Sequence, residues 1–179
     1  MPILFNEETN SFEGENLSGE TLSGFDFSVF GGLITNSGDI AGAIVGNSSA
    51  GIEITNELDA NISKAAGSPY AVTLLGNGGR NFFNDGTVFG VVRFGNGWDT
   101  LQNSGLIEGQ IRMGGGNDRV VNQLIPGIEG GETTGTVTGT IYMGNGNDVV
   151  LNLGTLNDVR LGGGDDRYSV TDLFGDGLS

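Results

Sequence analysis

The chain has 179 residues, of which 22 are acidic and 7 are basic, so its formal net charge at pH 7 is −15. Nucleic-acid binding through phosphates needs clustered Lys and Arg, and this charge balance therefore argues against it. The chain contains no Cys and no His, which excludes disulfides, thiolate metal sites and His-based acid–base catalysis. Its 35 Gly, three Pro and 36% hydrophobic residues indicate many tight turns between short buried strands.

The N-terminal segment and the hydropathy pattern indicate whether the chain carries a signal peptide or a membrane-spanning helix. The first ten residues, MPILFNEETN, lack the apolar stretch of a signal peptide. No apolar run approaches the ~20 residues that a membrane-spanning helix needs. We therefore expect no membrane insertion, and we expect any export to proceed without a cleavable N-terminal signal peptide.

Segments that begin with Asn recur along the chain. Successive starts are separated by 20, 20, 28, 19, 19 and 30 residues. The two long steps equal the base length plus an insertion, near residues 63–71 and at residues 123–134, and such insertions map to loops on a solenoid. The segments begin at Asn16, Asn36, Asn56, Asn84, Asn103, Asn122 and Asn152.

Apolar residues alternate with polar ones inside each segment, as in Val92 and Phe94 or Ile111 and Met113. Period-two alternation predicts half-buried strands, and a fixed period near 19 predicts that these strands stack. We expect an all-β fold, a single right-handed parallel β-helix of about seven coils with 19–20 residues per coil. Residues 1–35 would form an N-terminal cap and the first coil, and residues 36–179 the β-helix, with Gly-x-Gly-x-Asp turns from residue 95 onward.

In such a fold, equivalent residues of neighbouring coils lie ~4.8 Å apart and form columns. The amide column is expected to be structural, because stacked amides donate and accept hydrogen bonds along the stack. Its members are Asn84, Asn103, Asn122 and Asn152. A second, acidic column holds Asp99, Asp118, Asp148 and Asp166. A third, outward column holds Leu74, Arg93, Arg112, Tyr142 and Arg160.

The acidic column needs an explanation, because stacked carboxylates repel by about 1 kcal/mol per neighbouring pair even in water. A divalent cation between coils would reverse the sign, and turn glycines allow main-chain carbonyls to complete an oxygen ligand set for Ca²⁺. Mg²⁺ fits less well, since it requires strict octahedral geometry. The alternative is an Asp that hydrogen-bonds its own backbone. Arg80 holds the Asp position in the row GNGGRN, where the column should end.

The segments GNGWDTLQ, GGGNDRVV, GNGNDVVL and GGGDDRYS resemble the nonapeptide G-G-x-G-x-D-x-U-x of the repeats-in-toxin (hemolysin-type) calcium-binding proteins. The resemblance implies a secreted bacterial protein with Ca²⁺ as its cofactor, clamped between rows. The implied side-chain ligands are Asp99, Asp118, Asp148 and Asp166, with Asp165, Asn117 and Asn147 beside them. The implied carbonyl ligands belong to Gly97, Gly116, Gly146 and Gly164.

This chain departs from the repeats-in-toxin pattern in two ways. The first Gly of the motif is replaced, and each coil carries one motif, so ions are expected along one edge only. The replacing residues are Phe94, Met113, Met143 and Leu161. The half-coil NSGLIEG also resembles the β-helical passengers of bacterial autotransporters and adhesins.

Three functions follow as hypotheses. The first is a calcium-dependent structural or adhesive module without catalysis, located outside the cell or on its surface, with calcium ions and a polysaccharide or cell-surface molecule as partners. The second is a carbohydrate-active β-helix, a Ca²⁺-dependent polysaccharide lyase or polysaccharide-binding protein. Its ligand face would be Arg93, Arg112, Tyr142 and Arg160. The third is an acidic mimic of nucleic acid, suggested by the five-residue spacing of Leu17, Leu22 and Phe27.

The long step from Asn122 to Asn152 permits a register prediction. If residues 123–134 bulge out as a loop, Ile141 should stack on Ile111, and Val137 on Leu106 or Ile107. Asp148 should then lie above Asp118, so that the acidic column continues across the insertion.

Overall fold

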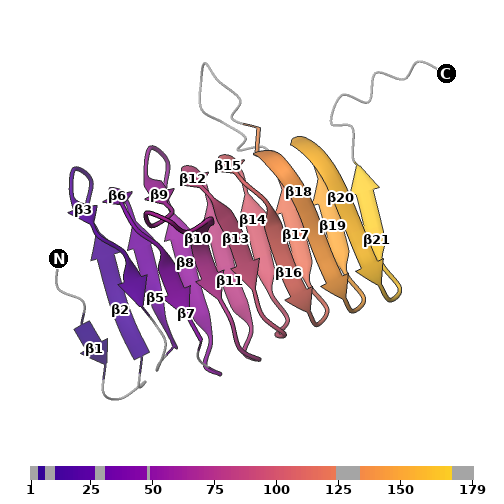
Figure 1. The fold of residues 1–179 in the computed structure, drawn as a ribbon, viewed down its shortest axis with the longest axis horizontal. Coiled ribbons are helices and arrows are strands. Elements are labelled where there is room, and N and C mark those ends of the chain that lie inside the picture. The colour runs from indigo at the N-terminus through magenta and orange to yellow at the C-terminus, as the bar shows by residue number, and fades with distance from the viewer. Residues whose placement is uncertain (1–3, 7–10, 27–30, 48, 124–133, 171–179) are drawn as a thin grey trace.

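A computed structural model describes residues 4–6, 11–26, 31–47, 49–123 and 134–170. The strands lie side by side along one axis, with the N-terminal strands at one end and β21 at the other (Figure 1). Neighbouring strands are parallel and no described residue is helical, which confirms the predicted all-β parallel β-helix. Accordingly, the described part of the chain contains no helix able to cross a membrane.

The first sheet has nine strands, in the order β1-β2-β5-β8-β11-β14-β17-β19-β21. Each pairs in parallel with the next, except that β1 runs antiparallel to β2 at the N-terminal edge. An antiparallel strand at this position covers backbone N–H and C=O groups that would otherwise form an open edge. The strands are β1 Leu4–Asn6, β2 Ser11–Asn16, β5 Gly31–Asn36, β8 Ile52–Asn56, β11 Arg80–Asn84, β14 Thr100–Asn103, β17 Arg119–Asn122, β19 Val149–Asn152 and β21 Arg167–Val170.

The second sheet consists of two rows of short strands, which the long strand β18 joins. One row runs β3-β6-β9-β12-β15-β18 and the other β4-β7-β10-β13-β16-β18, with β20 paired to β18. The strands are β3 Thr21–Leu22, β4 Phe25–Asp26, β6 Asp39–Ile40, β7 Ile44–Gly46, β9 Asn61–Ser63, β10 Tyr70–Leu74, β12 Thr87–Phe89, β13 Val91–Phe94, β15 Leu106–Glu108, β16 Ile111–Gly115, β18 Thr136–Asn145 and β20 Thr155–Gly163. Each coil thus supplies one strand to the first sheet and one or two to the second.

The core is built from the inward residues of every strand, stacked coil upon coil. One column of the first sheet pairs Phe82 with Leu101, Leu101 with Val120, and Val120 with Val150, and all four side chains are fully buried. Burial of such a side chain stabilises the fold by about 1.5–3 kcal/mol. Because each side chain packs on its neighbours above and below, the stability of one coil depends on the next.

The register across the second insertion is as predicted. Ile141 pairs with Ile111, and Val137 pairs with Ile107. The N–H of Asp118 donates to Oδ1 of Asp148 at 2.8 Å, so the acidic column continues across the insertion. The loop itself lies mostly outside the described residues, which resume at residue 134.

One predicted column member is wrong. Leu74 pairs with Phe94 and is buried in the core, whereas Thr73 is the residue that pairs with Arg93. The pairing of β10 with β13 shifts register between Tyr70 and Val72. From Val72 to Leu74 the pairing has an offset of 20 residues, and it returns to 19 only at Asn81, so counting back 19 residues from Arg93 gives a position that is off by one.

Candidate functional site

The acidic column lies at one corner of the coils, directly before the strands β14, β17, β19 and β21. A glycine-containing turn precedes each Asp and brings the chain round from the second sheet into the first. Asp99 and Asp118 are 1% exposed and Asp148 is fully buried, while Asp166 in the last coil is half-buried. The sequence-predicted carboxylates are therefore brought together, on the inside of the turn.

One oxygen of each carboxylate is bound to the backbone of the preceding coil. Oδ1 of Asp99 accepts from the Arg80 N–H at 2.9 Å, and Oδ1 of Asp118 accepts from the Asp99 N–H at 2.9 Å. The same bond joins Asp118 to Asp148 at 2.8 Å and Asp148 to Asp166 at 2.9 Å. The Asp side chains thus fasten each coil to its neighbour.

The second oxygen of three carboxylates has no such partner. Oδ2 of Asp99, Asp118 and Asp148 is buried and accepts no hydrogen bond from the described residues. An ionised carboxylate held away from water in this way is costly, so a buried polar atom of this kind calls for a proton, a water or an ion.

The pKa values of these carboxyl groups are raised, because burial disfavours the ionised form. Burial raises the pKa of Asp99 to about 6, although the Arg80 N–H and the Arg80 charge oppose the rise. Burial raises the pKa of Asp118 to about 7, and the charges of Asp99 and Asp148 add to it. Burial also raises the pKa of Asp148. At neutral pH these carboxyl groups therefore ionise only in part, unless a cation neutralises them.

The glycines of the turns have a steric role. Gly116 has φ of 119°, in the region that favours glycine. A Cβ on Gly116 would collide with the carbonyl oxygen of Gly97 in the preceding coil, and the same holds for Gly146 with Gly116 and for Gly164 with Gly146. Only glycine therefore permits the coil spacing here, and the oxygens of Gly97, Gly116 and Gly146 lie against the next coil.

The residues immediately before the aspartates form a separate, outer ladder. Oδ1 of Asn117 accepts from the Asn147 N–H at 2.8 Å, and Oδ1 of Asn147 accepts from the Asp165 N–H at 2.9 Å. All three side chains are exposed. Since successive residues of an extended chain face opposite sides, the structure does not bring them together with the buried carboxylates.

Arg80 ends the acidic column, as predicted, and is itself 1% exposed. Its guanidinium donates from Nη1 to the Ala50 carbonyl and from Nη2 to the Leu75 carbonyl, each at 2.8 Å. Burial lowers the Arg80 pKa, and the neighbouring charge of Asp99 opposes that shift. In this row the corner of the coil thus holds a cation bound by main-chain carbonyls, a feature that the residue pattern did not reveal.

The amide column lies at another position in the same coils and is structural, as predicted. Each Asn Nδ2 donates to Oδ1 of the Asn in the next coil, at distances of 2.7–2.9 Å. The column is longer than the four residues predicted from sequence. Its members are Asn16, Asn36, Asn56, Asn84, Asn103, Asn122 and Asn152.

The donor chemistry of the acidic column suits a hard cation. Carboxylate and carbonyl oxygens are the ligands that Ca²⁺ takes, six to eight at a time. Within the described ranges no three His, Cys, Asp or Glu residues lie close enough together to form a metal site. A cation would therefore combine the Oδ2 atoms of neighbouring coils with main-chain carbonyls and water.

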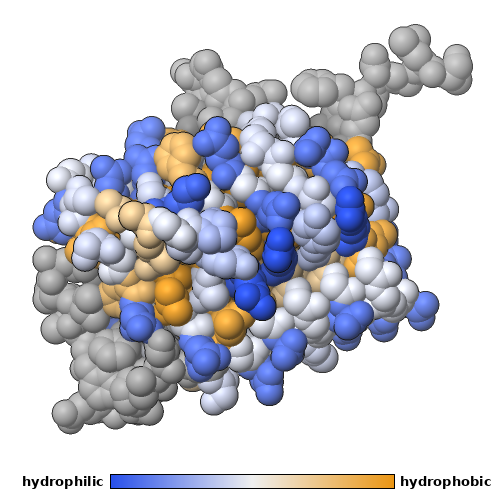
Figure 2. All heavy atoms as spheres, in the orientation of Figure 1, coloured by the Kyte–Doolittle hydropathy of each residue, from blue (hydrophilic) through white to orange (hydrophobic). Residues whose placement is uncertain are grey.

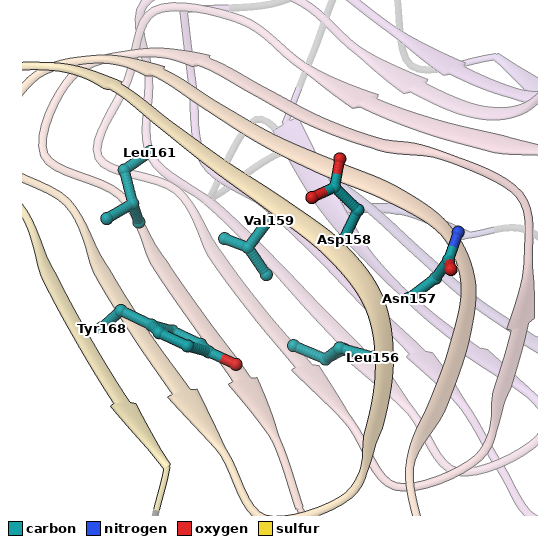
Figure 3. A pocket seen from close by; sticks show the side chains of 6 residues that line it. All are labelled: Leu156, Asn157, Asp158, Val159, Leu161 and Tyr168. Carbon is teal, nitrogen blue, oxygen red and sulfur yellow. The ribbon is translucent and has the colours of Figure 1, made fainter.

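A shallow hollow lies in the last coils, lined by Leu156, Asn157, Asp158, Val159, Leu161 and Tyr168 (Figure 3). The residues that pair with Leu156 and Val159 in the preceding coil are Val137 and Ile141, which are buried. Hydrophobic surface is accordingly visible at the end of the stack where β20 and β21 lie (Figure 2). The hollow is the last layer of the core, and its polar groups suggest no catalytic arrangement.

The fold and the site define a parallel β-helix whose coils are tied together by buried ladders of amides and carboxylates. Comparisons with protein-family models, with curated proteins and with solved structures find no match for this chain. Its function must therefore be argued from the chemistry of its own residues.

Proposed function

We propose that the chain is a calcium-binding β-helix with a structural or adhesive role, in which Asp99, Asp118, Asp148 and Asp166 hold Ca²⁺ between coils. The observation that carries the proposal is the row of three buried Oδ2 atoms, in register, without hydrogen-bond partners among the described residues. The other oxygen of each carboxylate accepts from a backbone N–H, so the side chains are held in one orientation that leaves Oδ2 for a cation.

A cation explains the column better than protonation at neutral pH. The pKa values of about 6 for Asp99 and about 7 for Asp118 leave much of the charge in place at pH 7. The Arg80 guanidinium supplies positive charge in the row next to Asp99, where Arg stands in place of Asp. Calcium accepts the irregular mixture of ligands that this corner offers, whereas Mg²⁺ demands an octahedron.

The ion would stabilise the folded chain and would take no part in catalysis. It neutralises the carboxylates and so favours the stacked coils over the unfolded chain. The Gly-x-Gly-x-Asp turns resemble those of the secreted repeats-in-toxin proteins. We therefore propose an extracellular or cell-surface site of action, where the loaded β-helix serves as a rigid support or an adhesive element.

Thermal unfolding in Ca²⁺ and in chelator tests the proposal. A ligand that binds only the folded state adds RT ln(1 + [L]/Kd), about 2.7 kcal/mol at a hundredfold excess over Kd. For a chain of this size that gain raises Tm by about 5–10 °C. Isothermal titration calorimetry on protein stripped of metal and dialysed free of chelator should show saturable Ca²⁺ binding. An unchanged Tm in saturating Ca²⁺ would contradict the proposal.

Replacement of Asp by Asn separates the ion from the backbone bond. In Asp118→Asn the Oδ1 acceptor for the Asp99 N–H is kept, while the charge is removed. We expect this variant to fold and to lose most of its Tm response to Ca²⁺. Asp59→Asn is the matched control, because Asp59 is exposed in a turn far from the column. If both variants respond as the parent does, calcium binds elsewhere.

A further inference from the structure

The outward face of the second sheet carries a column of charged and aromatic side chains. Arg93 on β13 pairs with Arg112 on β16, Arg112 with Tyr142 on β18, and Tyr142 with Arg160 on β20. These four residues are the Arg–Tyr column. Neighbouring members lie one strand apart, ~4.8 Å along the stack. The column therefore runs parallel to the axis of the β-helix.

The composition of the Arg–Tyr column is unusual for this chain. Only seven residues of the chain are basic against 22 acidic ones, and three of the seven stand in this column. Like charges directly opposite one another on neighbouring strands, as at Arg93 and Arg112, are destabilising. A column of this kind costs stability, so it points to a use other than holding the strands together.

Aromatic rings hold the guanidinium groups in place. Arg112 and Arg160 both lie over the ring of Tyr142, at 5.7 Å and 5.3 Å from its centroid. Arg93 lies 6.0 Å from the centroid of the Tyr70 ring in the preceding coil. Stacking on a ring face leaves the N–H groups at the guanidinium edge free to donate. The column is thus ordered before any ligand arrives.

The positive charge of the column is only partly neutralised by the protein. Arg160 pairs with Asp158 at 3.3 Å, but both side chains are about half exposed or more, at 65% and 48%, so the pair is weak. Arg112 donates to the neutral Gln110 at 2.8 Å. Within the described ranges, Arg93 and Arg112 form no ion pair. Two exposed guanidinium groups therefore remain for an external anion.

We propose that the Arg–Tyr column binds a linear anionic polysaccharide laid along the axis of the β-helix. Carboxylates of the polymer would be held by Arg93 and Arg112, since the guanidinium fork matches a carboxylate, and Arg160 would add a third contact by exchanging its weak pair with Asp158 for the polymer. The exposed part of the Tyr142 ring would contact a sugar ring. This site is separate from the acidic column and does not depend on calcium binding there.

Charge spacing selects a polysaccharide over a nucleic acid. The column offers one positive charge per strand spacing of ~4.8 Å, with a gap at Tyr142. Double-stranded DNA carries one negative charge per ~1.7 Å, far denser than the column can match. The net charge of −15 opposes every polyanion, and it opposes most strongly the one with the highest charge density. A polymer with one carboxylate per sugar residue suits the column better.

Binding of the full chain to linear polygalacturonate, measured by calorimetry in chelator-containing buffer, tests the proposal. We expect the double variant Arg93→Gln/Arg112→Gln to lose about tenfold or more in affinity. The matched control is Arg119→Gln/Arg167→Gln, which removes the same charge from exposed positions on the first sheet and should lose at most about twofold. Chelator removes any bridging of protein and polymer by Ca²⁺, and both variants keep the acidic column, so failure of this test is distinct from failure of the calcium proposal.

A third variant tests the aromatic contact. Tyr142→Leu should weaken polygalacturonate binding while its circular dichroism and Tm stay close to those of the parent. Equal losses in the two double variants would overturn the proposal, because the effect would then be one of net charge. Absence of binding to polygalacturonate, or tighter binding to double-stranded DNA, would overturn it as well.

Discussion

The amide column and the acidic column stack polar side chains inside the same coils, yet only one of them is complete. In the amide column, every Asn between the two ends both donates and accepts, so the ladder from Asn16 to Asn152 satisfies its interior amides by contacts of 2.7–2.9 Å, and only Oδ1 of the terminal Asn16 is buried without a partner among the described residues. In the acidic column, each Asp accepts one backbone N–H and leaves a buried Oδ2. An amide carries a donor and an acceptor, whereas a carboxylate carries acceptors only.

This difference separates the part of the molecule that only holds the coils together from the part that can also respond to its surroundings. A self-satisfied ladder has no need of a ligand and no dependence on pH. A ladder of carboxylates needs a proton or a cation from outside, unless the protein supplies one, as it does with Arg80. Substitutions that change one column and leave the other intact should therefore separate the two roles.

The largest effect is expected for Arg80→Met. The substitution removes the buried cation and leaves the Leu75 and Ala50 carbonyls without these donors, which should lower the free energy of unfolding by about 3–5 kcal/mol. Urea unfolding followed by circular dichroism measures it. Arg119→Met, at an exposed position of the first sheet, should cost less than about 0.5 kcal/mol. A similar small loss for both would mean that the Arg80 contacts contribute little.

The second effect breaks the amide column. Asn103→Ala removes the acceptor of Asn84 and the donor to Asn122, leaving buried polar atoms on both sides. We expect a loss of about 2–4 kcal/mol in urea unfolding, equal in Ca²⁺ and in chelator. Gln102→Ala on the same strand provides the control. A loss that depends on Ca²⁺ would show that the two columns are coupled.

The third effect is the pH dependence of the calcium-free protein. The folded-state pKa values of Asp99 and Asp118, about 6 and about 7, lie above those of the unfolded chain, so the folded state binds more protons between pH 4 and pH 7. The contribution of these groups to stability is therefore fully present below about pH 4 and is lost as the pH rises through about 6 for Asp99 and about 7 for Asp118. In chelator, the loss should be on the order of 2 kcal/mol.

The comparison that isolates this effect is between the parent chain and Asp118→Asn. The variant should lose less stability than the parent over the same rise in pH, because Asn does not ionise. Saturating Ca²⁺ should flatten the profile of the parent. If the profiles of parent and variant coincide in chelator, the buried carboxyl at this position does not govern the pH dependence.

The smallest effect concerns the insertion between Asn122 and Asn152, which both columns cross. The Asp118–Asp148 and Asn122–Asn152 hydrogen bonds already join the coils on either side, and the Gly135 N–H donates to the Gln123 carbonyl at 2.8 Å. Replacement of residues 124–133 by Asn-Gly should therefore change the unfolding free energy by no more than about 1–2 kcal/mol. Loss of the β-sheet circular dichroism signal would show that the insertion is part of the core.

Much of the fold and part of the site could be read from the repeat. A fixed period with alternating apolar residues determines which residues share a column, so the pairings of Arg93 with Arg112 and of Asp118 with Asp148 were predictable. The prediction for Leu74 failed where the coil is longer and the register shifts. Asn16, Asn36 and Asn56 were recognised as coil starts but not as members of the amide column, although their spacing carried that signal.

The sequence by itself determined the stacking: the period, the columns and the acidic excess are properties of residue order and composition. The tertiary structure decided what each column contacts. It placed the Asp99 Oδ1 on the Arg80 N–H, turned Asn117 and Asn147 outward, and brought the Arg80 guanidinium to the Leu75 and Ala50 carbonyls. Period fixes which side chains are neighbours along the stack. Which backbone group each one meets depends on the turn dihedrals and on the offset between coils, and only the assembled coils define these.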